Sequence, residues 1–496
     1  MRNSGIEGKF EGSHLDFVDA ILFQCRSNPA LPALCAPGTS LNVVSYGRLE
    51  RFIYNVAANG KQRGLTSGAT VALYCEDPIL HSALILGLTY AGMATLSVRS
   101  AQIPAGLGVT AAISDRAISF PGVATVLVAD HSWLAGDAVS AVRPHVTSDT
   151  PRRFILTSGT TGNAKCVALT NRMILDRVAL HNFAFGNALP ICERIFCDLG
   201  VSTSLGFLFL IHSLLRGGML VWRGADASQT MQAFGLYDVQ AMIASPSGLS
   251  EFLQYYEQSP KFGSPFRIVV SAGSLLSPHL AKSVRARLCP NLMSLYGSTE
   301  TSMVATAPAH MLQHHPKSVG YVLPGVTVQI VTASEAVLPT GQEGRIRIRT
   351  DCMASNYVGM NDGQSFRDGW FYPGDTGVLT AEGLLLIGGR ETSVINLGGD
   401  KINPETLEAA LQACPGVAEA GVFSELDEMG IEQLRIAVVA DASVSDQALR
   451  ECCGRLIPPE QVPARILRAP RLPRNAMGKL DRPALANGSF WDQHTS

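Results

Sequence analysis

The nine residues TSGTTGNAK, which run from Thr157 to Lys165, contain four hydroxyl side chains, two glycines and a lysine. This combination suits a loop that binds a polyanion, because glycines let backbone N–H groups approach phosphate and hydroxyls add adjustable donors. The segment does not match the common phosphate loop, which needs four residues between its glycines and then Gly-Lys-Ser/Thr. Here Gly159 and Gly162 are separated by two residues, and Cys166 follows the lysine. An ordinary turn has a similar composition, so the interpretation depends on the segments downstream.

Four further polar clusters follow along the chain. They are SLYGSTET (294–301), DGWFYPGDTG (368–377), GGRETSVINLGGDKINPETLE (388–408) and PRNAMGKLDR (473–482). Tyr296 offers a flat face, and Glu300 offers a hard oxygen ligand suited to Mg²⁺. Asp375 follows a Pro-Gly turn, where its carboxylate could accept hydrogen bonds from both hydroxyls of a ribose. Taken singly, these segments are equally typical of a polar loop, a hairpin turn and, around Lys479, a solvated tail.

Taken together and in this order, the five clusters resemble the adenylate-forming superfamily, which includes acyl-CoA synthetases, luciferases and the adenylation domains of peptide synthetases. The family patterns are Thr-Ser-Gly-Thr-Thr-Gly-x-Pro-Lys-Gly, Tyr-Gly-x-Thr-Glu, Gly-Trp-x-x-Thr-Gly-Asp, Gly-Arg-x-x-Asp and a C-terminal Gly-Lys. The resemblance extends from about Tyr46 to Arg482, which is nearly the whole chain. It implies that ATP and Mg²⁺ activate a small-molecule carboxylic acid as an acyl-adenylate with release of pyrophosphate. The acyl group is then expected to pass to the thiol of coenzyme A, giving acyl-CoA and AMP.

The resemblance also implies roles for individual residues. Lys479 matches the lysine that contacts the substrate carboxylate and the α-phosphate, Thr160 belongs to the phosphate loop, and Glu300 matches the Mg²⁺ ligand. The other implied nucleotide-binding positions are Thr157, Ser158, Gly159, Thr161, Gly162 and Lys165 at the phosphates, Gly273, Ser274, Tyr296 and Gly297 at adenine, Thr299 at the α-phosphate, and Asp375 and Arg390 at the ribose.

The second step involves another set of positions. The resemblance implies that the small domain rotates about a hinge at Thr392 and that Gly398 and Gly399 then help to form a pantetheine tunnel. A glycine pair suits a tunnel wall because a thin chain must pass close to the backbone. The expected acid pocket is lined by Ser202, Thr203, Ser247 and Ser298. These side chains are small and uncharged, so the identity of the acid stays open.

Electrostatics fits the first step. A carboxylate and ATP are both anions, and negative charge accumulates at the α-phosphorus in the transition state. A preorganised lysine together with Mg²⁺ stabilises that charge directly, without a proton-transferring base. Lys479 is therefore expected to be needed for adenylation but not for folding.

Three departures from the family pattern are visible. Thr392 stands where the hinge residue is usually Asp or Lys, and Ala164 and Cys166 replace the usual Pro and Gly of the phosphate loop. CoA synthetases commonly carry a histidine or an aromatic residue near Ser202 and Thr203. This last change indicates either a repacked pocket floor or an altered gate for thiol entry.

The pattern of the chain predicts an α/β fold. Short apolar runs alternate with helical segments, as at 69–75 and 77–94, which predicts parallel sheets sandwiched by helices. Alternating segments near 325–391 predict an antiparallel, β-barrel-like subdomain. We expect a large AMP-binding domain over 1–391 and a small mobile α+β domain over 392–496 that carries Lys479.

Composition excludes several classes of partner. The chain has 496 residues, 46% hydrophobic and 16% charged, with a net charge of −2, so neither nucleic acid nor anionic membrane is an expected partner. The most apolar stretch, 205–215, is too short to span a bilayer and predicts a buried helix. The start lacks the apolar core of a signal peptide. Eleven scattered cysteines without a CxxC pair indicate a reducing compartment, so we expect a cytoplasmic enzyme with no transmembrane segment.

Two other functions are open at this stage. The ending GKLDRPAL is similar to that of peptide-synthetase adenylation domains, which favours a stand-alone enzyme that loads an acyl or aminoacyl group onto an acyl carrier protein. In that case Asp198 could hold a substrate amine, although a surface or capping role is the alternative. A catalytically inactive relative acting as a scaffold is the third possibility. The joint presence of Lys165, Glu300, Asp375 and Lys479 argues against it.

Overall fold

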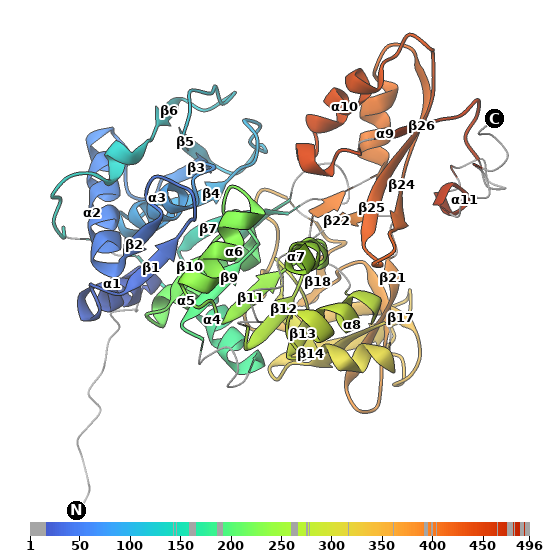
Figure 1. Ribbon diagram of the computed structural model, residues 1–496, viewed down its shortest axis with the longest axis horizontal. Coiled ribbons are helices and arrows are strands. Elements are labelled where there is room, and N and C mark those ends of the chain that lie inside the picture. Colours follow the sequence, from blue (N-terminus) through green and yellow to red (C-terminus); the bar gives the residue numbers. More distant parts are fainter. Residues whose placement is uncertain are drawn as a thin grey trace, which may run out of the picture.

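The computed structural model confirms the predicted α/β architecture, with a large N-terminal sheet region and a smaller C-terminal unit (Figure 1). It describes residues 16–141, 143–144, 146–157, 165–185, 192–258, 266–273, 276, 278–315, 317–360, 362–390, 395–397, 400–402, 404–463, 465–473, 480, 482–486 and 491. The predicted boundary between residues 391 and 392 lies outside these ranges and stays a prediction.

The first sheet has six strands in the order β6-β5-β3-β4-β7-β8. They are β3 (Thr70–Tyr74), β4 (Ala94–Ser97), β5 (Val109–Ser114), β6 (Thr125–Val128), β7 (Pro151–Thr157) and β8 (Lys165–Thr170). All neighbours are parallel except β7 and β8, which form an antiparallel pair with Thr157 opposite Lys165. The predicted phosphate loop therefore connects the ends of two hydrogen-bonded strands, which fixes where it leaves and re-enters the sheet.

The second sheet has fifteen strands, in the order β18-β19-β17-β20-β21-β15-β14-β13-β12-β11-β9-β10-β1-β2, with β16 paired to β17. Its mainly parallel half consists of β1 (Pro32–Cys35), β2 (Val43–Ser45), β9 (Arg194–Cys197), β10 (Met219–Val221), β11 (Ala241–Ala244), β12 (Ile268–Ser271) and β13 (Leu292–Ser298). Its antiparallel half consists of β14 (Ser302–Pro308), β15 (Ser318–Val322), β16 (Val326–Val331), β17 (Gly344–Thr350), β18 (Phe366–Arg367), β19 (Trp370–Phe371), β20 (Asp375–Leu379) and β21 (Leu384–Arg390). The predicted antiparallel segment is thus hydrogen-bonded to the parallel strands as one continuous sheet, and β13 and β14 join the two halves.

Helices pack against both sheets and close the core between them (Figure 1). They are α1 (Phe17–Ser27), α2 (Tyr46–Gln62), α3 (Pro78–Tyr90), α4 (Asn171–Ala184), α5 (Ser204–Leu215), α6 (Ala227–Leu236), α7 (Pro246–Gln258) and α8 (Pro278–Arg287), with short 3₁₀ turns η1 (His131–Leu134) and η2 (Ala309–Gln313). Helix α3 begins with Asp77 as N-cap and Pro78 in its first turn, which satisfies otherwise unpaired N–H groups. Helix α5 is the apolar stretch predicted as a buried helix, and residues 206–214 are all buried.

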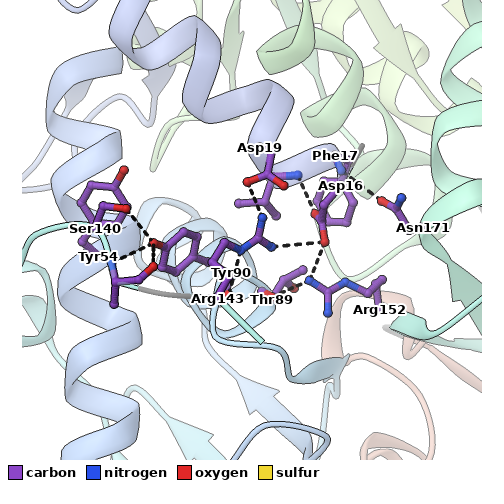
Figure 2. Close-up of polar contacts among 12 residues, drawn as sticks. Asp16, Phe17, Asp19, Tyr54, Thr89, Tyr90, Ser140, Arg143, Arg152 and Asn171 are labelled. Atoms are coloured by element: carbon purple, nitrogen blue, oxygen red, sulfur yellow. Dashed lines mark hydrogen bonds and ion pairs between the residues drawn. The ribbon is translucent and has the colours of Figure 1, made fainter. Parts of the chain in front are cut away.

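A buried polar network fixes the start of α1 against β7 and the end of α3 (Figure 2). Asp16 caps α1, and its Oδ2 receives Nη2 of Arg152 at 2.8 Å and Nη2 of Arg143 at 3.2 Å. Arg152 also donates to the carbonyl of Thr89 at 2.6 Å. Because the Arg152 side chain is fully buried, the Asp16 carboxylate supplies the opposite charge that such a guanidinium requires.

The C-terminal elements form a separate small unit, drawn in orange and red in Figure 1. They are β22 (Ile395–Leu397), β23 (Asp400–Ile402), α9 (Pro404–Gln412), β24 (Val417–Leu426), β25 (Glu432–Ala440), α10 (Asp446–Gly454), η3 (Pro459–Gln461), β26 (Ile466–Arg468) and α11 (Arg482–Ala486). This unit has its own apolar core around Leu411, Val422 and Ile436. It touches the larger part where Arg99 pairs with Asp400 at 2.9 Å.

Candidate active site

The hairpin of β13 and β14 positions most of the second predicted cluster. Ser298 lies opposite Ser302, so residues 299–301 form the turn. Gly297 is required beside this turn, because a Cβ there would lie 2.2 Å from the carbonyl oxygen of Ser302. The hairpin therefore holds Tyr296 and Glu300 at fixed positions near the junction between the two halves of the large sheet.

Tyr296 and Asp375, predicted at adenine and at ribose, are in direct contact. The Tyr296 hydroxyl donates to Oδ2 of Asp375 at 2.7 Å, and the carboxylate is buried. Asp375 begins β20 and lies opposite Arg390 of β21 in the antiparallel register. The sheet therefore brings the predicted nucleotide-binding positions Tyr296, Asp375 and Arg390 together, although the first and last are 94 residues apart in the sequence (390 − 296).

Glu300, the predicted magnesium ligand, is buried and held by its neighbours. The hydroxyl of Tyr357 donates to Glu300 Oε1 at 2.8 Å. The fully buried guanidinium of Arg177 on α4 donates to the carbonyls of Thr299 at 3.0 Å and Glu300 at 3.1 Å. It also donates to the carbonyl of Cys352 at 2.9 Å, so one arginine ties the hairpin turn to the segment that leads to Tyr357.

Lys165, the predicted phosphate-binding lysine, lies in the same neighbourhood. Its Nζ pairs with Asp362 Oδ2 at 2.5 Å and donates to Ser365 Oγ at 3.4 Å. The ammonium also lies over the ring of Tyr357, 4.6 Å from its centroid. Tyr357 therefore contacts both the predicted phosphate-binding cation and the predicted metal-binding carboxylate. We call Lys165, Asp362, Ser365, Tyr357 and Glu300 the Lys165–Glu300 cluster.

The ionisation of this cluster follows from burial and pairing. Burial, followed by the adjacent Glu300 carboxylate, raises the pKa of the Tyr357 phenol, so the phenol keeps its proton and acts as a donor. Burial alone would raise the pKa of Asp362, but hydrogen bonds from Lys165 and Ser365 hold it below its usual value. The cluster combines amine, carboxyl and hydroxyl groups, and these residue types suit the binding of phosphate oxygens and a hard metal ion.

The predicted acid-pocket residues are only partly available to a ligand. Thr203 caps α5: its Oγ1 accepts from the N–H of Gly206 at 3.0 Å and donates to the carbonyl of Gly200 at 2.8 Å. Ser202 beside it is half-buried. Ser247 is exposed and 2.9 Å from the Ser245 hydroxyl, while the Ser298 hydroxyl lies 3.1 Å from that of Thr301.

The carboxylate of Asp198 is already paired. Its Oδ1 receives Nε of Arg223 at 2.8 Å, and Arg223 also pairs with Glu251. This is the structural role that the sequence left open, and it argues against a role in holding a substrate amine.

Gly273 follows β12, which ends at Ser271, and belongs to the turn predicted to border adenine. Its φ of +98° lies in the left-handed region that favours glycine. Its carbonyl accepts Nδ2 of Asn396 at 2.9 Å, which brings the C-terminal unit to the edge of the predicted nucleotide site.

Several predicted residues lie outside the described part of the chain. They are Ser158, Gly159, Thr160, Thr161 and Gly162 of the phosphate loop, together with Ala164, Ser274, Thr392, Gly398, Gly399 and Lys479. Their roles stay predictions. Among the residues that the structure does describe, no group of three or more His, Cys, Asp or Glu side chains could hold a metal ion, and the role of Glu300 as a Mg²⁺ ligand stays a prediction. No helix in the described ranges is long and apolar enough to cross a membrane.

Sequence reasoning missed Arg177, Tyr357 and Asp362. Arg177 had a readable signal, because it shares a helix with Met173, Ile174 and Val178 on the buried face, where an arginine is unusual. Tyr357 and Asp362 lie in an irregular segment, and only the fold brings them to Lys165.

Comparison with known proteins identifies the family of the chain. The family model for AMP-binding enzymes matches residues 23–358, and the model for their C-terminal domain matches residues 406–479. The chain therefore belongs to the AMP-binding enzyme family. It is an adenylate-forming acid–thiol ligase, the class to which its acid–CoA ligase relatives belong.

Two relatives and one solved structure illustrate the range of this class. The chain is 25% identical to a fatty acid–[acyl-carrier-protein] ligase of Streptomyces coeruleorubidus, over 96% of each chain. It is 28% identical to a 2-succinylbenzoate–CoA ligase of Bacillus velezensis, over 72% of this chain and 73% of that one. The structure of a double mutant of o-succinylbenzoate CoA synthetase from Bacillus subtilis, bound with a product analogue, superposes with a TM-score of 0.81 at 21% identity, covering 94% of this chain and 98% of that chain.

Proposed function

We propose that this chain activates a small-molecule carboxylic acid with ATP and Mg²⁺ and transfers the acyl group to the thiol of coenzyme A. The observation that carries the proposal is the convergence of Lys165, Glu300 and Asp375, from three separate segments, around the β13–β14 hairpin and its contacts with Tyr296 and Tyr357. Each of these residue types suits the part of ATP assigned to it.

In the first step a carboxylate oxygen of the acid attacks the α-phosphorus of ATP. The bond from that phosphorus to the β-phosphate bridging oxygen breaks, and pyrophosphate leaves with the electron pair. Lys165 binds the outgoing phosphates, Asp375 and Tyr296 hold the nucleoside, and Lys479 stabilises charge at the α-phosphorus. Glu300 would hold Mg²⁺, which when bound would supply further positive charge to the ATP phosphates.

In the second step the thiolate of coenzyme A attacks the acyl carbonyl, and AMP leaves. Thr392 provides the hinge for the small domain, and Gly398 and Gly399 line the path of the pantetheine arm. A cytoplasmic location belongs to the same proposal, since all eleven cysteines are free thiols.

A carrier-protein thiol is the second candidate acceptor. It is favoured by the match to a fatty acid–[acyl-carrier-protein] ligase over 96% of both chains, and by the ending GKLDRPAL. The two candidates share the adenylation step and differ only in the thiol that approaches it.

The test is a pyrophosphate-release assay with ATP, Mg²⁺ and a panel of short, long, aromatic, dicarboxylic and amino acids. Each acid is assayed alone, with coenzyme A and with a phosphopantetheinylated carrier protein, and products are identified by mass. Acyl-CoA and AMP from one acid class would support the proposal, whereas an acyl-adenylate discharged only by the carrier protein would favour the second acceptor. Absence of pyrophosphate with every acid would refute both.

A Lys479→Ala protein serves as the matched variant in this assay. We expect adenylation to be lost while thermal unfolding stays within about 2 °C of the parent, because Lys479 is expected to act in adenylation and not in folding. Unchanged pyrophosphate release would contradict the role assigned to Lys479.

A further inference from the structure

Arg153 on β7 is a fully buried cation without a carboxylate partner in the described part of the chain. Its Nη1 donates to Thr95 Oγ1 at 3.1 Å, and its Nη2 donates to Ser97 Oγ at 2.5 Å, both on the neighbouring strand β4. Its Cζ lies 5.3 Å from the ring centroid of Phe207 on α5. Burial lowers the pKa of the guanidinium to about 9, which is still high enough to keep it charged at neutral pH.

Such a group is costly to bury, so its contacts indicate what it does. One hydrogen bond of Arg153 leaves the sheet and runs from Nη2 to the carbonyl of Val201, at 3.0 Å. Val201 lies within the 198–203 turn, immediately before Ser202 and Thr203, which border the expected acid pocket. Arg153 therefore joins this turn to β7, the strand that ends at the phosphate loop four residues later.

The rest of the 198–203 turn is held from other directions. Asp198 is bound by Arg223, and Thr203 caps α5. Gly206 packs so closely under the turn that a Cβ there would lie 2.2 Å from the carbonyl oxygen of Gly200. Arg153 connects the turn to the six-stranded sheet by a hydrogen bond, and the Ser97 hydroxyl that accepts from Arg153 lies 2.6 Å from Nε2 of His81.

We propose that Arg153 is a positioning residue that holds the 198–203 turn, and with it Ser202, in place against β7, which ends at Thr157, so that the acid and ATP are presented to each other correctly. The inference rests on the proposed function for the identity of the pocket. Substitution of Arg153 is therefore expected to change the KM for the acid rather than the KM for ATP.

Arg152 provides a matched control on the same strand. It is equally buried, but it pairs with Asp16 at the start of α1 and donates to the Thr89 carbonyl near the end of α3 (Figure 2). Neither of these described contacts is to the 198–203 turn. We would compare Arg153→Lys, Arg153→Met and Arg152→Lys in the full-length protein. Arg153→Lys keeps one cationic nitrogen that can donate hydrogen bonds. It can therefore still be measured if Arg153→Met does not fold.

The first readout is ATP–pyrophosphate exchange at varied acid and varied ATP. We expect Arg153→Met to raise the KM for the acid about 10-fold, with the KM for ATP within about twofold, and Arg153→Lys to fall between Met and the parent. Arg152→Lys should leave the KM for the acid unchanged. Equal rises in the two KM values, or equal effects of the 152 and 153 variants, would overturn the positioning role.

The second readout does not depend on activity. Hydrogen exchange of peptides covering 198–205 should be faster in Arg153→Met, and unchanged in Arg152→Lys. If the parent protein shows no ATP–pyrophosphate exchange with any acid, the proposed function fails. The hydrogen-exchange comparison of Arg153→Met with Arg152→Lys still decides whether Arg153 holds the turn. Unchanged hydrogen exchange, combined with loss only of acids that carry a second anionic group, would overturn positioning in favour of direct substrate contact.

Discussion

Tyr357 links the two charged groups of the Lys165–Glu300 cluster, since its hydroxyl donates to Glu300 and its ring lies under the Lys165 ammonium. A Tyr357→Phe protein keeps the ring and removes only the hydroxyl. We expect adenylation at limiting Mg²⁺ to fall about 10-fold or more, because a hydrogen bond to a buried carboxylate contributes about 1.5–3 kcal/mol. ATP–pyrophosphate exchange against Mg²⁺ concentration measures this. Tyr321→Phe, at an exposed position on β15, is the control, and a similar loss in both variants would contradict the role.

Asp362 belongs to the same cluster and pairs with Lys165. Its carboxylate holds the Lys165 ammonium at 2.5 Å, so Asp362→Asn should leave that ammonium less well placed for phosphate. We expect the KM for ATP to rise about 5- to 10-fold with little change in the KM for the acid, equivalent to about 1 kcal/mol of lost ATP binding. Initial rates at varied ATP would measure it. A lower KM for ATP would instead mean that Asp362 competes with phosphate for the lysine.

At the scale of elements, the start of α5 shows how closely backbone packing constrains the expected acid pocket. A Cβ at Gly206 would meet the carbonyl oxygens of Gly200 and Leu199 at 2.2 and 2.4 Å, and backbone cannot move aside as a flexible side chain can. Gly206→Ala should therefore destabilise the protein by about 1–3 kcal/mol. Urea unfolding measures this, with Gly454→Ala at the open end of α10 as a control expected to be neutral or stabilising. Equal unfolding midpoints for the two variants would be inconsistent with the clash.

Much of this element level could be predicted from the sequence. The strand predicted at 69–75, the helix at 77–94 and the buried helix at 205–215 are observed as β3, α3 and α5, because apolar runs bounded by turn residues are local signals. Tyr296, Asp375 and Glu300 were predicted as site residues from spaced motifs, and their roles stay predictions. Asp362 and Tyr357 were not predicted, because their place in the site depends on a contact with Lys165 across about 200 residues of chain. The role of Thr203 as a helix cap likewise depends on where α5 begins.

At the scale of the whole molecule, three buried histidines should make the fold sensitive to acid. Burial, together with neighbouring cations, lowers the pKa of His81 and of His212 to about 3, and lowers that of His181 well below its usual value. His181 and His212 face each other between α4 and α5, with ring centroids 6.0 Å apart and no hydrogen-bond partner in the described structure. All three are therefore neutral in the folded protein near neutral pH.

The direction of the effect follows from proton binding. Below pH 6.5 the unfolded chain protonates these histidines, whereas the folded chain does not do so until about pH 3 for His81 and His212. The free energy of unfolding should therefore fall as the pH falls from about 6.5 towards 3, by about 1.4 kcal/mol per pH unit for each histidine. His212→Leu keeps an apolar side chain in the α4–α5 contact and removes one such group. The free energy of unfolding, measured with urea between pH 6 and 4, should fall less steeply with falling pH in this variant than in the parent, by about that amount per pH unit. His279→Gln, at an exposed position, should leave this pH dependence unchanged. An identical slope in His212→Leu and the parent would mean that His212 does not stay neutral in the folded state.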